Sequence, residues 1–215
     1  MPGETEIHYT GGVMKNLFKF GPLFLLTLLL IPGPITAADT SFQLNVNSDD
    51  VEGRIDVKLN PYQTPMSFGG GFLYSDDKEE YWLANINLAV KDEVFTPPLS
   101  LGAGFKGIFG RTDFGPFDRD TAALAFQFLG EFDFRKTTSA NVPISIVAEV
   151  SYAPDILSFN DTEKYFDFYT AGYFHINYFA SVFVGYRDLE IDYKAGGRKD
   201  TLSDDSFFLG VKLSF

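Results

Sequence analysis

Apolar and polar residues alternate with a period of two along most of the chain. The clearest run is AALAFQFLGEFDF, residues 122–134, in which Leu124 and Phe126 share one face while Gln127 and Glu131 share the other. A β-strand points successive side chains to opposite faces, so this pattern predicts strands with one apolar face each. Outside the N-terminal region, no run repeats its apolar residues every 3.6 positions. We therefore predict an all-β fold.

Ten such runs follow one another, and short polar or proline-bearing turns separate them. They cover residues 41–47, 53–59, 67–75, 81–90, 99–110, 122–134, 144–152, 165–176, 178–193 and 205–215. The two halves of the ninth run prefer opposite phases, and a β-bulge between Gly185 and Asp188 would reconcile them. No linker or change of composition suggests a second domain. The pattern predicts one antiparallel domain of about ten strands.

The N-terminal region has the layout of a secretory signal peptide over residues 14–38. Lys15 and Lys19 precede an apolar run of about a dozen residues, which is too short for a spanning helix of roughly 20 residues. We expect cleavage after Ala37 or Ala38, which leaves residues 39–215 as the folded domain. Residues 1–13 fit a signal peptide poorly and are expected to be an upstream extension outside the fold. A cytoplasmic arm ahead of a retained anchor is the alternative.

Composition narrows the class of protein further. The chain has no cysteine, so an exported domain must be held by packing and strand pairing alone. Its formal net charge is −12, which argues against nucleic acid as a partner. Aromatic residues make up 17% of the chain, with 24 Phe, and this is more apolar surface than a soluble domain of this size needs.

Many residues on the polar faces are small, such as Gly69, Gly102 and Ala125, and small residues fill a narrow lumen well. The apolar faces are large, with aromatic residues near the strand ends that suggest girdles at Tyr74, Tyr81, Trp82, Phe134, Tyr152, Phe166 and Phe215. The pattern predicts an antiparallel transmembrane β-barrel in the bacterial outer membrane, with lipid and lipopolysaccharide around it. A secreted β-sandwich or a lipocalin-like barrel remains the alternative. An even number of strands returns both termini to the periplasmic side.

The last strand ends on an aromatic residue after alternating apolar positions. Its apolar face consists of Phe207, Leu209, Val211, Leu213 and Phe215. This ending looks like the terminal signal by which bacterial outer-membrane barrels are recognised during assembly. The likeness implies the barrel-assembly machinery as a partner.

Two segments carry a more specific resemblance. VSYAPDILSFNDTEKYFDF at residues 150–168 and VFVGYRDLEIDY at residues 182–193 resemble the YfaZ family of small bacterial outer-membrane proteins. The Tyr-Ala-Pro before Leu-Ser-Phe and the Gly-Tyr-Arg of the penultimate strand carry the likeness, which covers roughly residues 40–215. It implies an outer-membrane location in a Gram-negative bacterium and supplies no activity.

Charged residues on the predicted inner faces bear most directly on function. We expect ten of them in the lumen: Arg54, Asp56, Lys58, Lys106, Glu131, Asp133, Glu149, Asp167, Arg187 and Lys212. Buried charges are costly unless they are paired, so opposite signs in a narrow lumen should pair or hold water. These residues predict a largely plugged barrel that is a structural or interaction protein, or else a narrow channel.

An outer-membrane enzyme acting on lipid A or phospholipid is the alternative function. His175 is the one histidine after the signal region, and Ser145, Ser151, Ser181 and Glu149 lie on neighbouring strands. No Ser is next to it in sequence, so a histidine of the lumen or interface is the preferred interpretation, with no catalytic residue assigned. The acidic loops SDDKEE and DTLSDD could bind divalent cations loosely, but neither has the spacing of a dedicated metal site. No cofactor is indicated, and the sequence names neither a solute nor an oligomeric state.

Overall fold

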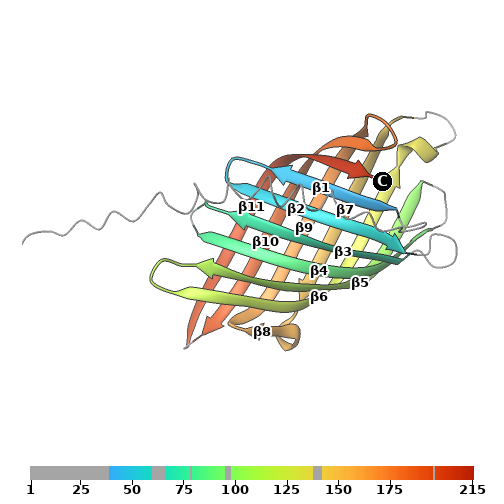
Figure 1. Ribbon diagram of the computed structural model, residues 1–215. Coiled ribbons are helices and arrows are strands. Elements are labelled where there is room, and N and C mark those ends of the chain that lie inside the picture. Colours follow the sequence, from blue (N-terminus) through green and yellow to red (C-terminus); the bar gives the residue numbers. More distant parts are fainter. Residues whose placement is uncertain (1–38, 60–65, 78, 95–97, 138–141, 196) are drawn as a thin grey trace, which may run out of the picture. The chain divides into compact units, whose positions relative to one another are not determined.

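A computed structural model of the protein describes residues 39–59, 66–77, 79–94, 98–137, 142–195 and 197–215 (Figure 1). The predicted upstream extension and signal peptide, residues 1–38, lie outside the described residues, as do parts of three predicted turns at 60–65, 95–97 and 138–141.

Strands make up almost the whole described domain. In chain order they are β1 (Thr40–Val46), β2 (Asp50–Leu59), β3 (Met66–Ser75), β4 (Glu80–Glu93), β5 (Leu99–Asp113), β6 (Asp118–Asp133), β7 (Ile144–Ala153), β8 (Ser158–Asn160), β9 (Thr162–His175), β10 (Ala180–Ala195) and β11 (Arg198–Ser214). Two single-turn 3₁₀ helices, η1 (Phe134–Lys136) and η2 (Asp155–Leu157), follow β6 and β7. No helix in the described part is long and apolar enough to cross a membrane.

The strands close into one antiparallel barrel. Consecutive strands pair from β1 to β7 and from β9 to β11, and β7 pairs with β9. β1 also pairs with β11, from Ser41↔Ser214 to Val46↔Leu209, which joins the two ends of the sheet. Both β7 and β8 pair with β6, at successive levels. They therefore act as one strand interrupted by η2, and the barrel has the ten strands that the sequence predicts.

The two ends of the barrel differ. Thr40 and Phe215 lie side by side at one end, because the amide of each residue donates a hydrogen bond to the carbonyl of the other, at 3.1 and 2.8 Å. We call this the terminal end, marked C in Figure 1, and the opposite end the distal end. At the distal end β10 and β11 pair without interruption as far as Ala195↔Arg198, so this hairpin is longer than predicted.

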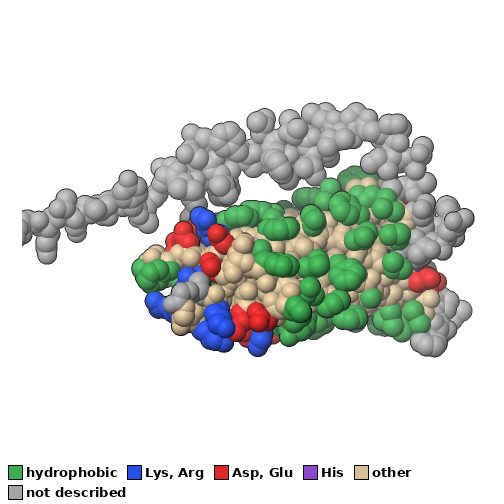
Figure 2. Space-filling model, turned by 90° about the horizontal axis from the view of Figure 1, so that it is seen from below, with side chains coloured by type: hydrophobic (Ala, Val, Ile, Leu, Met, Phe, Trp, Pro, Cys, Tyr) green, Lys and Arg blue, Asp and Glu red, His purple; other side chains and the backbone are tan. Residues whose placement is uncertain are grey.

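The apolar faces of the strands point outward and the polar faces point inward. Outward-facing residues that keep 40–60% of their area exposed include Phe68, Phe72, Trp82, Phe105, Phe109, Phe126, Phe128, Phe174, Val184 and Val211. Figure 2 shows hydrophobic side chains spread over much of the barrel wall, with most visible charges gathered toward the distal end. A closed barrel with such an apolar exterior satisfies its backbone hydrogen bonds internally, as a bilayer requires. The predicted membrane barrel is confirmed.

Two details of the prediction are wrong, and they have one cause. Strand β10 pairs with β11 at constant register, so Gly185 to Asp188 contain no bulge; the irregularity on the β9 side lies between Asp192 and Tyr193. Tyr81 does not belong to an aromatic girdle, because it points inward and is 2% exposed. In both places the inner face changes from polar to apolar near the distal end, where the lumen is filled by a small hydrophobic core.

Candidate functional site in the lumen

Six charged side chains meet in the middle of the lumen, and we call them the charge cluster. They are Glu52, Arg54, Lys106, Glu149, Asp167 and Arg187, from five different strands. Three are acidic and three are basic, so their formal charges cancel. Residues of β2, β5, β7, β9 and β10 can meet in this way because every strand points alternate side chains into the barrel.

Each charge in the cluster contacts an opposite charge. Arg187 Nε lies 3.0 Å from Asp167 Oδ1, and Lys106 Nζ lies 2.8 Å from the other oxygen of the same carboxylate. Arg54 Nε lies 2.8 Å from Glu52, and its Nη1 lies 3.2 Å from Glu149. Lys106 and Asp167 are 2% and 0% exposed. Leaving one buried charge unpaired is strongly destabilising, so the cluster is held as a unit.

Neutral polar groups surround the cluster and add hydrogen bonds to it, although the buried Arg54 Nη2 has no partner among the described residues. Gln43 Nε2 donates to the Tyr169 hydroxyl at 2.8 Å, and the Tyr173 hydroxyl donates to Gln43 Oε1 at 2.9 Å. Gln127 Nε2 donates to Glu149 at 2.8 Å, and the Arg54 guanidinium lies 4.2 Å from the centre of the Tyr169 ring. The charges are thus embedded in a polar network that spans the lumen.

On the distal side of the cluster the lumen is filled by hydrophobic side chains, which we call the distal plug. It consists of Leu73, Tyr81, Leu83, Ile108, Ala123, Ala125, Ala153, Tyr165, Leu189, Ile191, Tyr193 and Leu202. The hydroxyl of Tyr193 is satisfied by Thr112 at 2.8 Å and Thr121 at 2.7 Å, while that of Tyr81 bonds to Asp204. The plug therefore fills this level of the barrel without leaving these hydroxyls unpaired.

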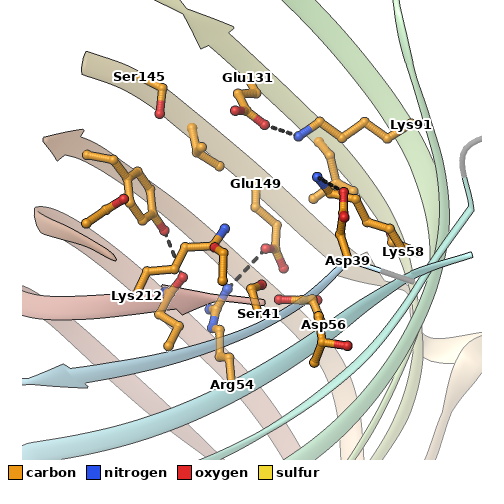
Figure 3. A pocket seen from close by; sticks show the side chains of 18 of the residues that line it. Asp39, Ser41, Arg54, Asp56, Lys58, Lys91, Glu131, Ser145, Glu149 and Lys212 are labelled. Carbon is orange, nitrogen blue, oxygen red and sulfur yellow. Dashed lines mark hydrogen bonds and ion pairs between the residues drawn. The ribbon is translucent and has the colours of Figure 1, made fainter. Parts of the chain in front are cut away.

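On the terminal side the lumen holds a cavity of about 440 Å³, which we call the vestibule (Figure 3). Arg54, Lys106 and Glu149 of the charge cluster lie at its inner limit, and Asp39 and Phe215 belong to the terminal end. Its wall carries Lys91, bonded to Glu131, and also Asp56 and Lys212. Cavities of this size accept small ligands.

Of the ten charged residues predicted in the lumen, the structure brings Arg54, Lys106, Glu149, Asp167 and Arg187 into the charge cluster. Lys58, Asp56, Glu131 and Lys212 line the vestibule, with Lys58 close to Asp39 at 3.9 Å. Asp133 is buried at the terminal end of β6 and pairs with Arg135, Nη2 to Oδ2, at 2.8 Å.

Glu52 and Lys91 are lumen residues that the sequence interpretation missed. Both lie just beyond the runs assigned to the second and fourth strands, and the alternation of inward and outward residues continues through them. Extending the alternation by one step from Arg54 gives Glu52, and from Asn87 through Ala89 it gives Lys91. The unbroken alternation of inward and outward residues is therefore the sequence signal that identifies both residues.

His175 is held between two serine hydroxyls on the inner wall. Its Nε2 lies 2.9 Å from Ser145 Oγ, and its Nδ1 lies 2.8 Å from Ser181 Oγ. Both serines come from strands next to β9, so they were close in space although distant in sequence. Among the described residues no carboxylate hydrogen-bonds to the ring, whereas a Ser-His-acid triad requires one. Ser151 and Glu149 lie elsewhere, Glu149 in the charge cluster.

The remaining predicted features lie on the outside or at the distal end. The outward-facing and exposed residues at the end of the chain are Phe207, Leu209, Val211 and Leu213 of β11 and Phe215 directly after it. Asp204 and Asp205 of the acidic segment DTLSDD are consecutive in a strand and point to opposite faces, with Asp204 bonded to Tyr81. Among the described residues no three His, Cys, Asp or Glu side chains are grouped closely enough to hold a metal ion.

Comparison with known proteins gives one family and several solved structures. No curated protein matches the chain. Among solved structures, Neisserial surface protein A has 12% identity and a TM-score of 0.36, with 83% of this chain and 94% of that chain covered. The NanC porin has 12% identity and a TM-score of 0.45, with 83% and 100% covered. Vibrio cholerae OmpT has 12% identity and a TM-score of 0.37, with 77% and 56% covered.

The family comparison spans the whole barrel and part of the segment before it. Residues 18–215 match the family described as "YfaZ precursor", a description compatible with a signal peptide. The chain therefore belongs to the YfaZ family and is a β-barrel protein of the bacterial outer membrane.

Proposed function

We propose that the protein is a closed outer-membrane barrel that serves as a structural or interaction protein and does not conduct solutes. One observation carries this proposal: the charge cluster and the distal plug occupy successive levels of the lumen. Leu189, Ile191 and Tyr193 have no exposed area, and neither does Asp167 of the cluster. A solute crossing the barrel would have to separate buried ion pairs and displace a hydrophobic core, each at a cost of several kcal/mol.

In this proposal the terminal end faces the periplasm, because an exported chain starts there and both termini lie together. The vestibule then opens toward the periplasm, and the distal end faces the outside. Lipid and lipopolysaccharide surround the apolar wall, and the barrel-assembly machinery inserts the protein. The acidic distal segments, SDDKEE and DTLSDD, bind divalent cations loosely in this proposal.

Conductance of the purified protein in planar bilayers tests the closed lumen. We expect no steady openings from the wild-type protein. Replacing Leu189, Ile191 and Tyr193 together by Ser should produce openings or raise leakage, since polar side chains admit water. A matched variant with Asp188, Glu190 and Asp192 replaced by Ser changes the outer side of the same strand and should stay silent. Large, steady openings in the wild-type protein would contradict the proposal.

An enzyme acting on lipid A or phospholipid is the second candidate, and the contact between Ser145 and His175 is the observation that favours it. A histidine can activate a serine hydroxyl at this distance. However, the pair lies on the inner wall, while lipid acyl chains contact the outer wall. A lipid substrate would therefore have to enter the vestibule from the terminal end.

A further inference from the structure

We propose that the vestibule binds a small zwitterion, a molecule with one ammonium and one carboxylate group such as an amino acid or a short peptide. Lys212 would bind the carboxylate, and Asp56 with Asn87 would bind the ammonium. This inference rests on the proposed function, because the vestibule is a pocket with one opening only if the lumen is closed.

Lys212 and Asp56 differ from the charges deeper in the lumen in forming no ion pair with a described residue, although Lys212 Nζ lies over the Tyr173 ring. Each member of the charge cluster contacts an opposite charge, and Lys91 pairs with Glu131. Neither Lys212 nor Asp56 makes a hydrogen bond or an ion pair within 4.0 Å through its side chain to any described residue. Both line the vestibule and are partly exposed to it. Two unpaired charges of opposite sign on one wall match a ligand that carries both.

The surroundings of Asp56 form a cradle for an ammonium group. A Cβ atom placed on Gly69 would lie 2.3 Å from Asp56 Oδ1 and 2.9 Å from Asn87 Oδ1. The two oxygen atoms thus converge above a glycine that provides the space for them, on three neighbouring strands. Oxygen acceptors with one negative charge are the partners that an ammonium group needs.

Lys212 itself would supply the contact to the carboxylate, because the Gln43 amide already bonds to Tyr169 and Tyr173 and the Ser181 hydroxyl to His175. The cross-strand neighbours of Lys212 are Gln43 on β1 and Ser181 on β10, and its Nζ lies 5.5 Å from the centre of the Tyr173 ring. Asp56 lies on β2, one strand beyond β1, and pairs with Ser41. Figure 3 shows Lys212 and Asp56 on the same side of the vestibule with Ser41 between them. Both charges therefore face the same cavity, on strands that β1 alone separates.

Calorimetric titration of the full-length folded protein in detergent tests this site. The probe is alanyl-alanine, compared with N-acetyl-alanyl-alanine, which lacks the ammonium group, and alanyl-alanine amide, which lacks the carboxylate. We expect saturable binding of the dipeptide and at least about tenfold weaker binding of each derivative, since each derivative loses one charge-assisted contact. Lack of saturable dipeptide binding, or equal binding of all three, would overturn the inference.

Variants assign each end of the ligand. Lys212→Met should abolish the preference for alanyl-alanine over its amide. Asp56→Asn should abolish the preference for alanyl-alanine over N-acetyl-alanyl-alanine. Gly69→Ala should weaken binding of the dipeptide, because its methyl group would lie 2.3 Å from Asp56 Oδ1 and displace that carboxylate. Lys194→Met and Asp192→Asn, at the distal end, are matched controls and should bind as the wild type does. Unchanged preferences in Lys212→Met and Asp56→Asn would refute the assignment, provided that the unheated protein still migrates as a compact band.

The bilayer recording and the dipeptide titration test the closed barrel and the zwitterion site independently. A silent bilayer recording together with no dipeptide binding would remove the zwitterion site and leave the closed barrel. Steady openings together with wild-type dipeptide binding would remove the closed barrel and leave the site.

Discussion

Arg187 and Asp167 form a two-point ion pair in the middle of the lumen. Nε lies 3.0 Å from Oδ1 and Nη2 lies 3.2 Å from Oδ2, and the aspartate has no exposed area. The partners lie on neighbouring strands but are not directly opposite, because Arg187 pairs in register with Tyr169 and Asp167 with Leu189. The guanidinium thus reaches along the lumen, and it also contacts Glu52 at 3.2 Å. This pair joins the two sides of the charge cluster.

Removing one partner of this pair should be more harmful than removing both. Arg187→Leu leaves a buried carboxylate with Lys106 as its remaining ion-pair partner, and we expect the free energy of unfolding to fall by about 3–5 kcal/mol. The double variant Arg187→Leu, Asp167→Leu should recover part of this loss. Urea unfolding in lipid vesicles measures both. Lys199→Leu, which removes an exposed pair with Glu163, is the control and should leave stability nearly unchanged, because solvent screens exposed ion pairs.

Two inward glycines make room for aromatic rings on neighbouring strands. Gly185 lies opposite Phe208, and Gly210 lies opposite Phe183. A Cβ atom on Gly185 would come within 2.3 Å of the Phe208 ring, and one on Gly210 within 2.1 Å of the Phe183 ring. Alanine at either position should therefore lower stability by about 1–3 kcal/mol through overpacking.

Gly172 provides the matched control for both substitutions. It lies on β9, and nothing comes within 4 Å of a Cβ atom placed on it. Gly172→Ala should change stability by no more than about 0.5 kcal/mol. The same loss of stability in all three alanine variants would mean that backbone freedom, and not the ring contacts, explains the effect.

The alternation of polar and apolar residues predicts some features of this barrel and not others. Alternation predicts the strands, their apolar outer faces and the inward position of residues such as Arg54 and Asp167, because a strand's phase is a local property. It fails at Leu189, Ile191 and Tyr193, where inward residues are apolar and look like outward ones. Alternation also does not predict which charges pair with each other. Lys106 and Asp167, for example, are 61 positions apart in sequence and meet across the lumen.

The serine and histidine contacts allow a direct test of the enzyme alternative. Ser145→Ala, Ser151→Ala and His175→Ala should each leave the lipid A and phospholipid profiles of the cell unchanged, because these side chains face the lumen. Mass spectrometry of extracted lipids measures this against a deletion of the whole protein. A change that appears in the deletion and is reproduced by Ser145→Ala and His175→Ala would favour the enzyme.

The last prediction concerns Phe215. Its backbone bonds to Thr40 at the closure of the barrel, while its side chain faces outward and is 65% exposed. Phe215→Ala keeps both backbone hydrogen bonds and removes roughly 1.5–3 kcal/mol of apolar burial in lipid, too little to unfold a closed barrel. If the barrel-assembly machinery recognises the terminal strand, this variant should be exported normally but give much less membrane-inserted protein. Phe174→Ala removes the same side chain from the outer face of β9 and should insert at full yield. Cell fractionation with unheated gel electrophoresis compares the two, and equal yields of the compact membrane band would refute a terminal signal at Phe215.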